Sequence, residues 1–547
     1  MSRPIFAGLV VLAIAGAIPF PATASQRPAP RFEGLGNHHH RVTTRSKAAQ
    51  RFFDQGMALT FAFNHAEAGR SFEEVAWLDP QCAMAWWGTA LVLGPNINAP
   101  MDTAVVRVAY AAVQNALVLA ARATPRERAY IEALAKRYGP VPMADRKGLD
   151  EAYAAAMIDV AARFPEDDDA ATLAAEAQMD LHPWNYWTKA GEPQPWTPAI
   201  VSGLERVLKR SPEHPLAIHL YIHAVEASMT PGRAEPYADR LPQLMPGAGH
   251  IVHMPSHVYI RTGRYHDAAL ANLAARKVDE DYVSQCHAQG IYPLGYVPHN
   301  HHFLWAAASM EGWSAMAFEA AGSTDRKTAH EMMRDPGMGT LQHYALTPLY
   351  ALVRFGKWDE ILATPAPQPD LLYPTGIWHY ARGRALVAKG KLDEAQTALA
   401  ALEVIAARDT LEKITIWDIN TIKGLMGVAV EVLAGELAAA RGDYATAVPR
   451  LEEAVRREDA LNYNEPADWY YPVRHSLGAV LLSAGRAADA EAVYRQDLKY
   501  NPENGWSLFG LMKSLEAQQQ GDEAAAVKAR FEIAWKNADV VLTASRF

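Results

Sequence analysis

The stretch 471–502, YPVRHSLGAVLLSAGRAADAEAVYRQDLKYNP, shows the pattern that decides the fold. Small residues occupy its eighth, fifteenth and twentieth positions, an aromatic residue the twenty-fourth and a proline the thirty-second, namely Gly478, Gly485, Ala490, Tyr494 and Pro502. Small side chains let two helices approach closely, a glycine suits the turn between them, and a proline follows the second helix. The stretch therefore predicts a helix, a turn and a second helix.

The pattern recurs along the chain with a period of about 34 residues. Other units start near Ala49, Gly376 and Val428 and keep their small residues in register. Strand signals are scarce, whereas runs rich in Ala, Leu and Glu, which favour helix, are common. Because 547 residues are too many for one compact core, the sequence predicts several domains or one elongated all-α array.

This pattern resembles the tetratricopeptide repeat (TPR) family over about two-thirds of the chain. The resemblance implies an α-solenoid, a right-handed superhelix of helix-turn-helix repeats with a concave groove. It also implies that the second, fifth, ninth and twelfth positions of each first helix face the groove. The last unit, near 505–535, reads as a degenerate capping repeat. The commonest role in this family is an interaction scaffold that binds a peptide or partner protein in the groove.

The amino-terminal residues 1–24 are predicted to be a secretory signal peptide. Arg3 precedes a short apolar run at 9–18, and Ala22-Thr23-Ala24 offers a cleavage site with small residues. The run is too short to span a bilayer, and no later stretch is expected to form a membrane helix. We therefore expect a periplasmic or secreted protein without membrane insertion after cleavage. The rest divides into an N-terminal extension (25–47), an array with insertions (48–340) and a second array (341–547).

Charge and cysteine content exclude several classes of protein. The net charge of −9 and the pI near 6.1 argue against nucleic acid as a partner. With only two cysteines, the chain cannot be a small scaffold held together by several disulfides. Cys82 could form a disulfide with Cys286, but we prefer the interpretation that Cys82 is simply buried. The sequence contains no Gly-rich phosphate loop, Gly-x-Ser-x-Gly elbow, His-Glu-x-x-His or Cys-x-x-Cys motif, so no familiar hydrolase, kinase or redox scaffold is indicated.

Histidines are concentrated in one part of the chain. Ten of the twenty lie within 219–302. Two consecutive units, starting at 215 and 249, carry histidine at their fifth and ninth positions, one helical turn apart. A third unit, starting at 298, carries histidine at its second and fifth positions. If these first helices line one groove, their imidazoles converge. The histidines so placed are His219, His223, His250, His253, His257, His299 and His302.

These histidines and Glu226 together predict a transition-metal site. Imidazoles one turn apart on a helix can share a metal ion, and Glu226 adds a carboxylate one turn after His223. Zinc and copper suit imidazole ligands, and non-heme iron is an option if Glu226 ligates. An open coordination position would allow the metal to activate water or dioxygen, so the sequence leaves open whether the protein is an enzyme.

Two observations weigh against a metal. Groove histidines could instead hydrogen-bond one another, nearby tyrosines or a bound peptide, which would fit an interaction scaffold. Pro255, between His253 and His257, must open or kink the helix and would loosen their pairing.

Other features are less specific. We interpret the run His38-His39-His40 as solvated rather than as part of a metal site. Insertions at 94–101, 182–198 and 282–297 carry aromatic residues or asparagines, and they either cover the groove or pack against the outer face.

Overall fold

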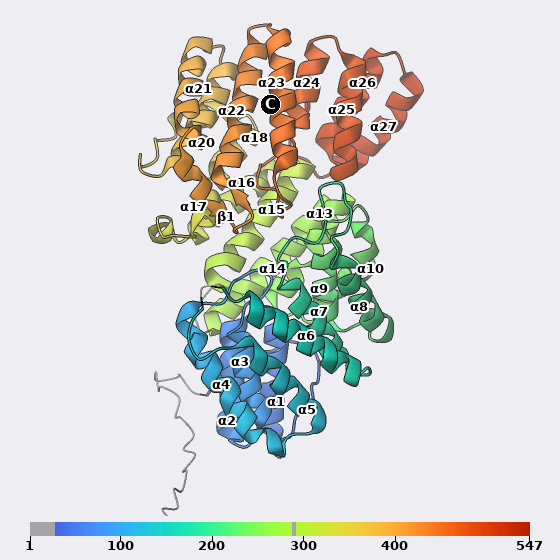
Figure 1. Ribbon diagram of the computed structural model, residues 1–547. Coiled ribbons are helices and arrows are strands. Elements are labelled where there is room, and N and C mark those ends of the chain that lie inside the picture. Colours follow the sequence, from blue (N-terminus) through green and yellow to red (C-terminus); the bar gives the residue numbers. More distant parts are fainter. Residues whose placement is uncertain (1–27, 144, 287–291) are drawn as a thin grey trace, which may run out of the picture.

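The computed structural model describes residues 28–143, 145–286 and 292–547, so the signal peptide predicted for residues 1–24 lies outside the described residues. Figure 1 shows two stacks of helices, blue and green for the first half of the chain and orange and red for the second, with yellow-green helices between them. We call α1–α16 the N-terminal array and α17–α27 the C-terminal array. The described residues form the predicted all-α solenoid of helical hairpins.

The N-terminal array also includes short 3-10 helices and one π-helical turn. Its elements are α1 (Lys47–Phe61), α2 (His65–Leu78), α3 (Ala83–Val92), η1 (Thr103–Val105), α4 (Val106–Leu119), η2 (Ala120–Arg122), α5 (Pro125–Leu134), η3 (Ala135–Arg137), α6 (Lys147–Arg163), α7 (Asp168–Met179), α8 (Thr197–Arg210), α9 (Pro215–Val225), η4 (Pro231–Ala234), α10 (Glu235–Ala238), α11 (Leu241–Leu244), α12 (Gly249–His253), α13 (Pro255–Thr262), α14 (Tyr265–Gln285), η5 (Tyr292–Tyr296), α15 (Val297–Glu311) and α16 (Ser314–Lys327).

The C-terminal array is more regular and contains a small antiparallel hairpin of two-residue strands. Its elements, after the connecting turn η6 (His330–Met332), are α17 (Gly339–Ala345), α18 (Thr347–Arg354), α19 (Trp358–Ala363), α20 (Leu372–Ala388), α21 (Leu392–Ala406), η7 (Asp409–Lys413), β1 (Thr415–Ile416), β2 (Asn420–Thr421), α22 (Ile422–Ala440), α23 (Tyr444–Ala460), α24 (Arg474–Ser483), α25 (Ala487–Tyr500), α26 (Gly505–Ala517) and α27 (Gly521–Ala534).

The small residues of the repeat lie where two helices of a hairpin touch. A Cβ atom added to Gly478 of α24 would overlap the buried ring of Tyr494 in α25, and one added to Gly56 of α1 would lie 2.6 Å from the Phe72 ring in α2. Gly485 has a φ of +74° in the turn between α24 and α25, a conformation that glycine adopts without steric cost. The predicted register therefore sets both the turn and the close packing.

Replacing Gly478 by alanine is expected to destabilise the protein, although alanine ordinarily stabilises a helix interior by about 1 kcal/mol relative to glycine. The new methyl group must displace the Tyr494 ring, and such overpacking costs about 1–3 kcal/mol. Urea unfolding followed by circular dichroism measures the change. Gly203→Ala in α8 is the matched control, because its nearest neighbour lies 3.9 Å away and the substitution should be neutral or stabilising. Equal behaviour of the two variants would contradict the packing argument.

One helical run is longer and more apolar than the sequence analysis led us to expect. Thr103–Arg122, which joins η1, α4 and η2, has 20 residues and a mean hydropathy of 1.6, and it is long and apolar enough to cross a membrane. The expectation that no stretch after the signal peptide has this character is therefore wrong for this run. In the structure, 33% of an apolar 18-residue stretch within this run is buried, and α4 packs against α3 and α5.

The contact between α15 and α26 is one of the places where the two arrays meet. The indole of Trp506 in α26 is fully buried and donates its Nε1–H to the carbonyl oxygen of Ser309 in α15 at 3.0 Å. The guanidinium of Arg354 lies 3.6 Å from the centre of the same ring. The last unit, predicted to be degenerate, is a complete hairpin of α26 and α27 whose first helix closes this junction.

Candidate metal centre

Four helices bring six imidazole rings together. The helix α9 begins at Pro215, as the register predicts, and all of its residues are buried. Between α12 and α13, Met254 keeps helical φ and ψ values of −50° and −36°, so the chain continues through Pro255 almost without a break. As predicted, the helix is interrupted, because α12 ends at His253 and α13 begins at Pro255, but the expected loosening of the pair is wrong, since His253 Nε2 and His257 Nε2 lie 2.8 Å apart. The six rings are His219 and His223 of α9, His250 and His253 of α12, His257 of α13 and His299 of α15.

The rings form two groups. We call His219, His223 and His250 the first group, and His253, His257 and His299 the second group. Within each group, one nitrogen of every ring lies within 4.8 Å of the others. Five of the six residues are buried to 2% exposure or less, and His299 is partly buried.

The nitrogen spacing matches what one ion requires. In the first group, the Nε2 atoms of His219 and His250 are 3.2 Å apart. In the second, His253 Nε2 lies 2.8 Å from His257 Nε2 and 3.2 Å from His299 Nε2. Nitrogens bound to one tetrahedral ion at 2.0–2.1 Å lie about 3.3–3.4 Å apart. The residues therefore fit a transition metal without large movement.

The opposite ring nitrogens of His219 and His253 are held by acceptors. His219 Nδ1 donates to the Phe61 carbonyl oxygen at 2.8 Å, and His253 Nδ1 donates to Asn272 Oδ1 at 2.7 Å. Asn272 Nδ2 donates to the Ala268 carbonyl oxygen, which orients its Oδ1 toward His253. These acceptors keep the proton on Nδ1 and the lone pair on Nε2, which is how proteins orient histidine ligands toward a metal.

Each group has a polar requirement that an ion would meet, and in the second group a proton on His257 would meet it as well. The 2.8 Å contact between His253 and His257 would place two lone pairs against each other unless a proton or a cation lies between them. His223 Nε2 is buried and has no hydrogen-bond partner among the described residues. An unsatisfied buried group of this kind costs about 1–3 kcal/mol.

Two carboxylates lie on the outer side of the rings. Glu226, at the C-terminus of α9, contacts His223 Nδ1 through Oε1 at 3.3 Å and His257 Nδ1 through Oε2 at 2.8 Å. Glu465, in the loop between α23 and α24, contacts His257 Nδ1 at 2.9 Å. Glu226 was predicted as a ligand, and it lies close enough to His223 and His257 for these three residues to hold an ion. Its contacts are with their Nδ1 atoms, opposite the converging Nε2 atoms.

Burial and these contacts set the charges. Burial lowers the pKa of His219, His250 and His253, so these rings are neutral and able to ligate. Burial also opposes charge on His257 and Glu226, but their mutual attraction outweighs it, raising the pKa of His257 and lowering that of Glu226. Without an ion, the second group therefore carries its positive charge on His257.

Two of the predicted insertions cover the first group. In the insertion at 182–198, the Trp184 ring lies edge-on to the His223 ring with centroids 5.2 Å apart. In the described part of the insertion at 282–297, the Tyr292 hydroxyl accepts a hydrogen bond from His250 N, and the Tyr296 ring lies 4.8 Å from the His250 ring. These aromatic side chains limit access of water to the histidines.

His302 lies apart from both groups. Its ring contacts the His343 ring at 5.2 Å, and His343 Nδ1 is hydrogen-bonded to the Tyr373 hydroxyl at 2.8 Å. His302 was predicted as a ligand together with His299, but these residues point to different neighbours. Cys82 is buried, and Cys286 donates its thiol proton to Glu67 Oε1 at 3.0 Å, so these two described cysteines form no disulfide with each other.

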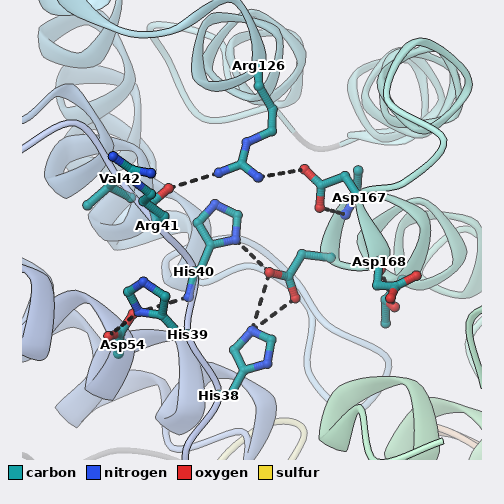
Figure 2. A network of polar contacts seen from close by, with 12 residues as sticks. His38, His39, His40, Arg41, Val42, Asp54, Arg126, Asp167 and Asp168 are labelled. Atoms are coloured by element: carbon teal, nitrogen blue, oxygen red, sulfur yellow. Dashed lines mark hydrogen bonds and ion pairs between the residues drawn. The ribbon is translucent and has the colours of Figure 1, made fainter. Parts of the chain in front are cut away.

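The N-terminal extension is tied down by its three consecutive histidines (Figure 2). His40 Nδ1 lies 2.6 Å and His38 Nε2 3.1 Å from the carboxylate of Asp169, while His39 Nδ1 lies 2.9 Å from Asp54 Oδ2. The side chains of His38 and His40 are 15% and 2% exposed. The interpretation of this run as solvated is therefore wrong for these two residues, although His39 is 56% exposed.

The same carboxylate positions α9. His214 Nδ1 accepts a hydrogen bond from Ala217 N at the start of this helix, so Nε2 carries the proton and donates to Asp169 Oδ1 at 2.9 Å. His214, Asp169 and His38 are close enough to hold an ion, but the proton on Nε2 removes His214 as a ligand. A cavity of about 490 Å³ borders this network. The contacts link the N-terminal extension to the helix that carries His219 and His223.

Replacing Asp169 by asparagine is expected to lower the free energy of unfolding by about 1–3 kcal/mol, because ring N–H donors lose a buried charged acceptor. Burial opposes ionisation, but His214, His38 and His40 lower the pKa of Asp169 well below its usual value. Because the pKa of Asp169 is lower in the folded than in the unfolded protein, its ionised carboxylate stabilises the fold at pH values above the unfolded-state pKa. This stabilisation is lost in acid, so the difference in unfolding free energy between wild type and Asp169→Asn should shrink as pH falls below about 4.

Urea unfolding at several pH values measures this difference. Asp159→Asn is the control, since its pairing with Arg163 is exposed and should contribute less than about 1 kcal/mol. A pH-independent difference between wild type and Asp169→Asn would contradict the assignment.

Three supporting groups were not predicted from the sequence, namely Glu465, Asn272 and the Phe61 carbonyl. Glu465 and Phe61 come from distant parts of the chain, and nothing in their local sequence marks them. Asn272 offers a weak signal, because it is a fully buried polar residue on the Ala-rich face of α14.

Comparisons with known proteins concern the architecture alone. No model of a known protein family and no curated protein matches the chain. The solved structure of the human IFIT1 dimer with PPP-AAAA is similar with 11% identity and a TM-score of 0.32, covering 90% of this chain and 91% of that chain. The TPR domain of P58(IPK) is similar with 12% identity and a TM-score of 0.23, covering 87% and 99%. At these TM-scores the likenesses carry no argument about ligands. The helical hairpins described above make this chain a TPR-like α-solenoid.

Proposed function

We propose that this TPR-like protein is exported and binds a transition metal, zinc or copper, at its buried histidines. The observation that carries the proposal is the convergence of Nε2 atoms at 2.8–3.2 Å, together with the acceptors that hold the Nδ1 atoms of His219 and His253. Imidazole nitrogens are good ligands for both metals. Export to the periplasm or the exterior rests on the sequence of residues 1–24.

The donor set favours zinc or copper over non-heme iron. An iron site of the two-histidine, one-carboxylate type would use Glu226 with His223 and His257, which also lie close enough to hold an ion, but six of the seven side chains gathered here are imidazoles. Three histidine ligands leave a fourth position for water or dioxygen, the arrangement of catalytic zinc sites. In that role the metal would supply Lewis acidity, while Glu226 and Glu465 orient His257 and the aromatic insertions limit the access of water.

Elemental analysis of protein purified without a histidine tag, from medium containing zinc and copper, tests the proposal. We expect near-stoichiometric metal that a chelator removes with a fall in thermal stability, because an ion that binds the folded state stabilises it. Metal-free protein whose melting temperature does not respond to added zinc or copper would refute the proposal. His330→Ala, which removes an exposed histidine, controls for adventitious surface binding.

A second candidate function is a scaffold that binds an extended peptide along the C-terminal array. The chain's own last residues already lie there: Ser545 Oγ donates to the His475 carbonyl oxygen at 2.7 Å, and Arg546 pairs with Glu436 at 2.9 Å. A cavity of about 220 Å³ adjoins them. Fluorescence polarisation of a labelled peptide of residues 536–547, added to a variant truncated at 535, tests this function. Absence of binding to a folded variant would count against it.

A further inference from the structure

We propose that the centre holds two metal ions at once, one in each histidine group. This inference rests on the proposed function and adds the number of ions and their arrangement. The two groups share no ring: one nitrogen set belongs to His219, His223 and His250, and the other to His253, His257 and His299. A single tetrahedral ion uses about four ligands, so one ion cannot satisfy both sets.

Each group separately calls for a cation. In the first group, the buried His223 Nε2 has no hydrogen-bond partner within the described chain, and an ion in the second group would not change that. In the second group, His253 Nε2 faces both His257 Nε2 and His299 Nε2, contacts that need a proton or a cation between the nitrogens and that an ion in the first group would not supply. An ion in one group therefore does not satisfy the ring nitrogens of the other group.

The two groups also adjoin each other. The ring centroids of His223 and His257 are 5.2 Å apart, and those of His250 and His253 are 5.8 Å apart. Within the groups, His219 and His223 are separated by 5.0 Å and His253 and His257 by 4.8 Å. Rings across the boundary are thus about as close as rings within a group, which is the arrangement of a dinuclear site rather than of two remote ions.

One carboxylate serves both groups. Glu226 is fully buried and contacts His223 of the first group through Oε1 and His257 of the second through Oε2. Asn272, by contrast, supports only His253 of the second group. Removing such an outer partner typically weakens metal binding by about 10–100-fold. Glu226→Gln should therefore weaken both ions, whereas Asn272→Ala should weaken one.

The test counts ions in chelator-stripped full-length protein reloaded with zinc, by elemental analysis and calorimetric titration. We expect two ions in wild type, one in His250→Ala, one in His299→Ala and none in the double variant. His302→Ala is the matched control, since it removes a buried histidine from the same helix as His299 but outside both groups, and it should keep two ions. Circular dichroism confirms that each variant is folded.

Copper loading tests whether the ions are adjacent. Two neighbouring Cu²⁺ ions couple their spins, so wild type should show a weakened or dipolar-split electron paramagnetic resonance signal. His299→Ala should show the full signal of an isolated ion. One ion in wild type, or two ions with uncoupled signals, would overturn the dinuclear inference while leaving the proposed function intact. No bound ion in any protein would overturn the proposed function itself.

Discussion

Replacing His223 and His257 together by alanine is expected to reduce bound metal from near-stoichiometric to background while the helix content stays unchanged. The double variant removes one ligand from each group, and it leaves Glu226 buried without either of its ring partners. Two histidines remain in each group, too few for a buried three-nitrogen site. Elemental analysis after zinc or copper loading gives the metal content, and far-ultraviolet circular dichroism gives the helix content.

The matched control is the double replacement of His302 and His343, two buried histidines that contact each other outside both groups. It should lose a similar amount of packing but keep its metal. If it lost metal equally, the effect would be general destabilisation rather than loss of ligands. Full metal content in the His223 and His257 variant would show that the ion binds elsewhere.

Replacing Trp506 by alanine is expected to lower the free energy of unfolding by about 3–5 kcal/mol, as for other large buried aromatic residues. The indole is fully buried, its N–H donates to Ser309 of the other array, and Arg354 stacks on its face. The substitution therefore opens a cavity at the junction of the two arrays and removes the nearer of the two rings that the Arg354 guanidinium contacts. Thermal and urea unfolding followed by circular dichroism measure the loss.

A second substitution separates the contributions of the Trp506 side chain. Trp506→Phe keeps an aromatic ring beneath Arg354 but removes the donor to Ser309, so it should cost less than alanine. Ile533→Ala, at a side chain of α27 that is 70% exposed, should change stability by about 0.5 kcal/mol or less. A similar small change at both positions would mean that the junction contributes little to stability.

The register of small residues predicted most of the fold, because helix pairing is encoded locally and repeated. Units expected to start at 215, 249 and 298 correspond to helices that begin at Pro215, Gly249 and Val297. The direction in which a side chain points from its helix was harder to predict than the position of the helix. His299 and His302 are three positions apart, which is about 60° around the helix axis, enough to direct them to different neighbours.

Long-range partners could not be predicted from spacing. The run His38-His39-His40 looks solvated by composition, yet Asp169 of a distant helix accepts from His38 and His40. Glu226 is a similar case: its position one turn after His223 suggested a metal ligand, but the approach of His257 from another helix, which brings two rings to one carboxylate, could not be predicted from spacing. A contact that exists only after folding leaves no periodic signal in the sequence.

Glu465 has a consequence for how the two arrays behave together. It belongs to the C-terminal array, but its carboxylate lies 2.9 Å from His257 Nδ1, and nearby Arg261 donates to the carbonyl oxygen of Tyr500. If the proposed ion binds, its uptake and the docking of one half of the superhelix on the other are linked equilibria, and each must favour the other by the same free energy. A partner that flexes the superhelix at this seam would then change the affinity for the proposed ion, and that ion would in turn stiffen the seam.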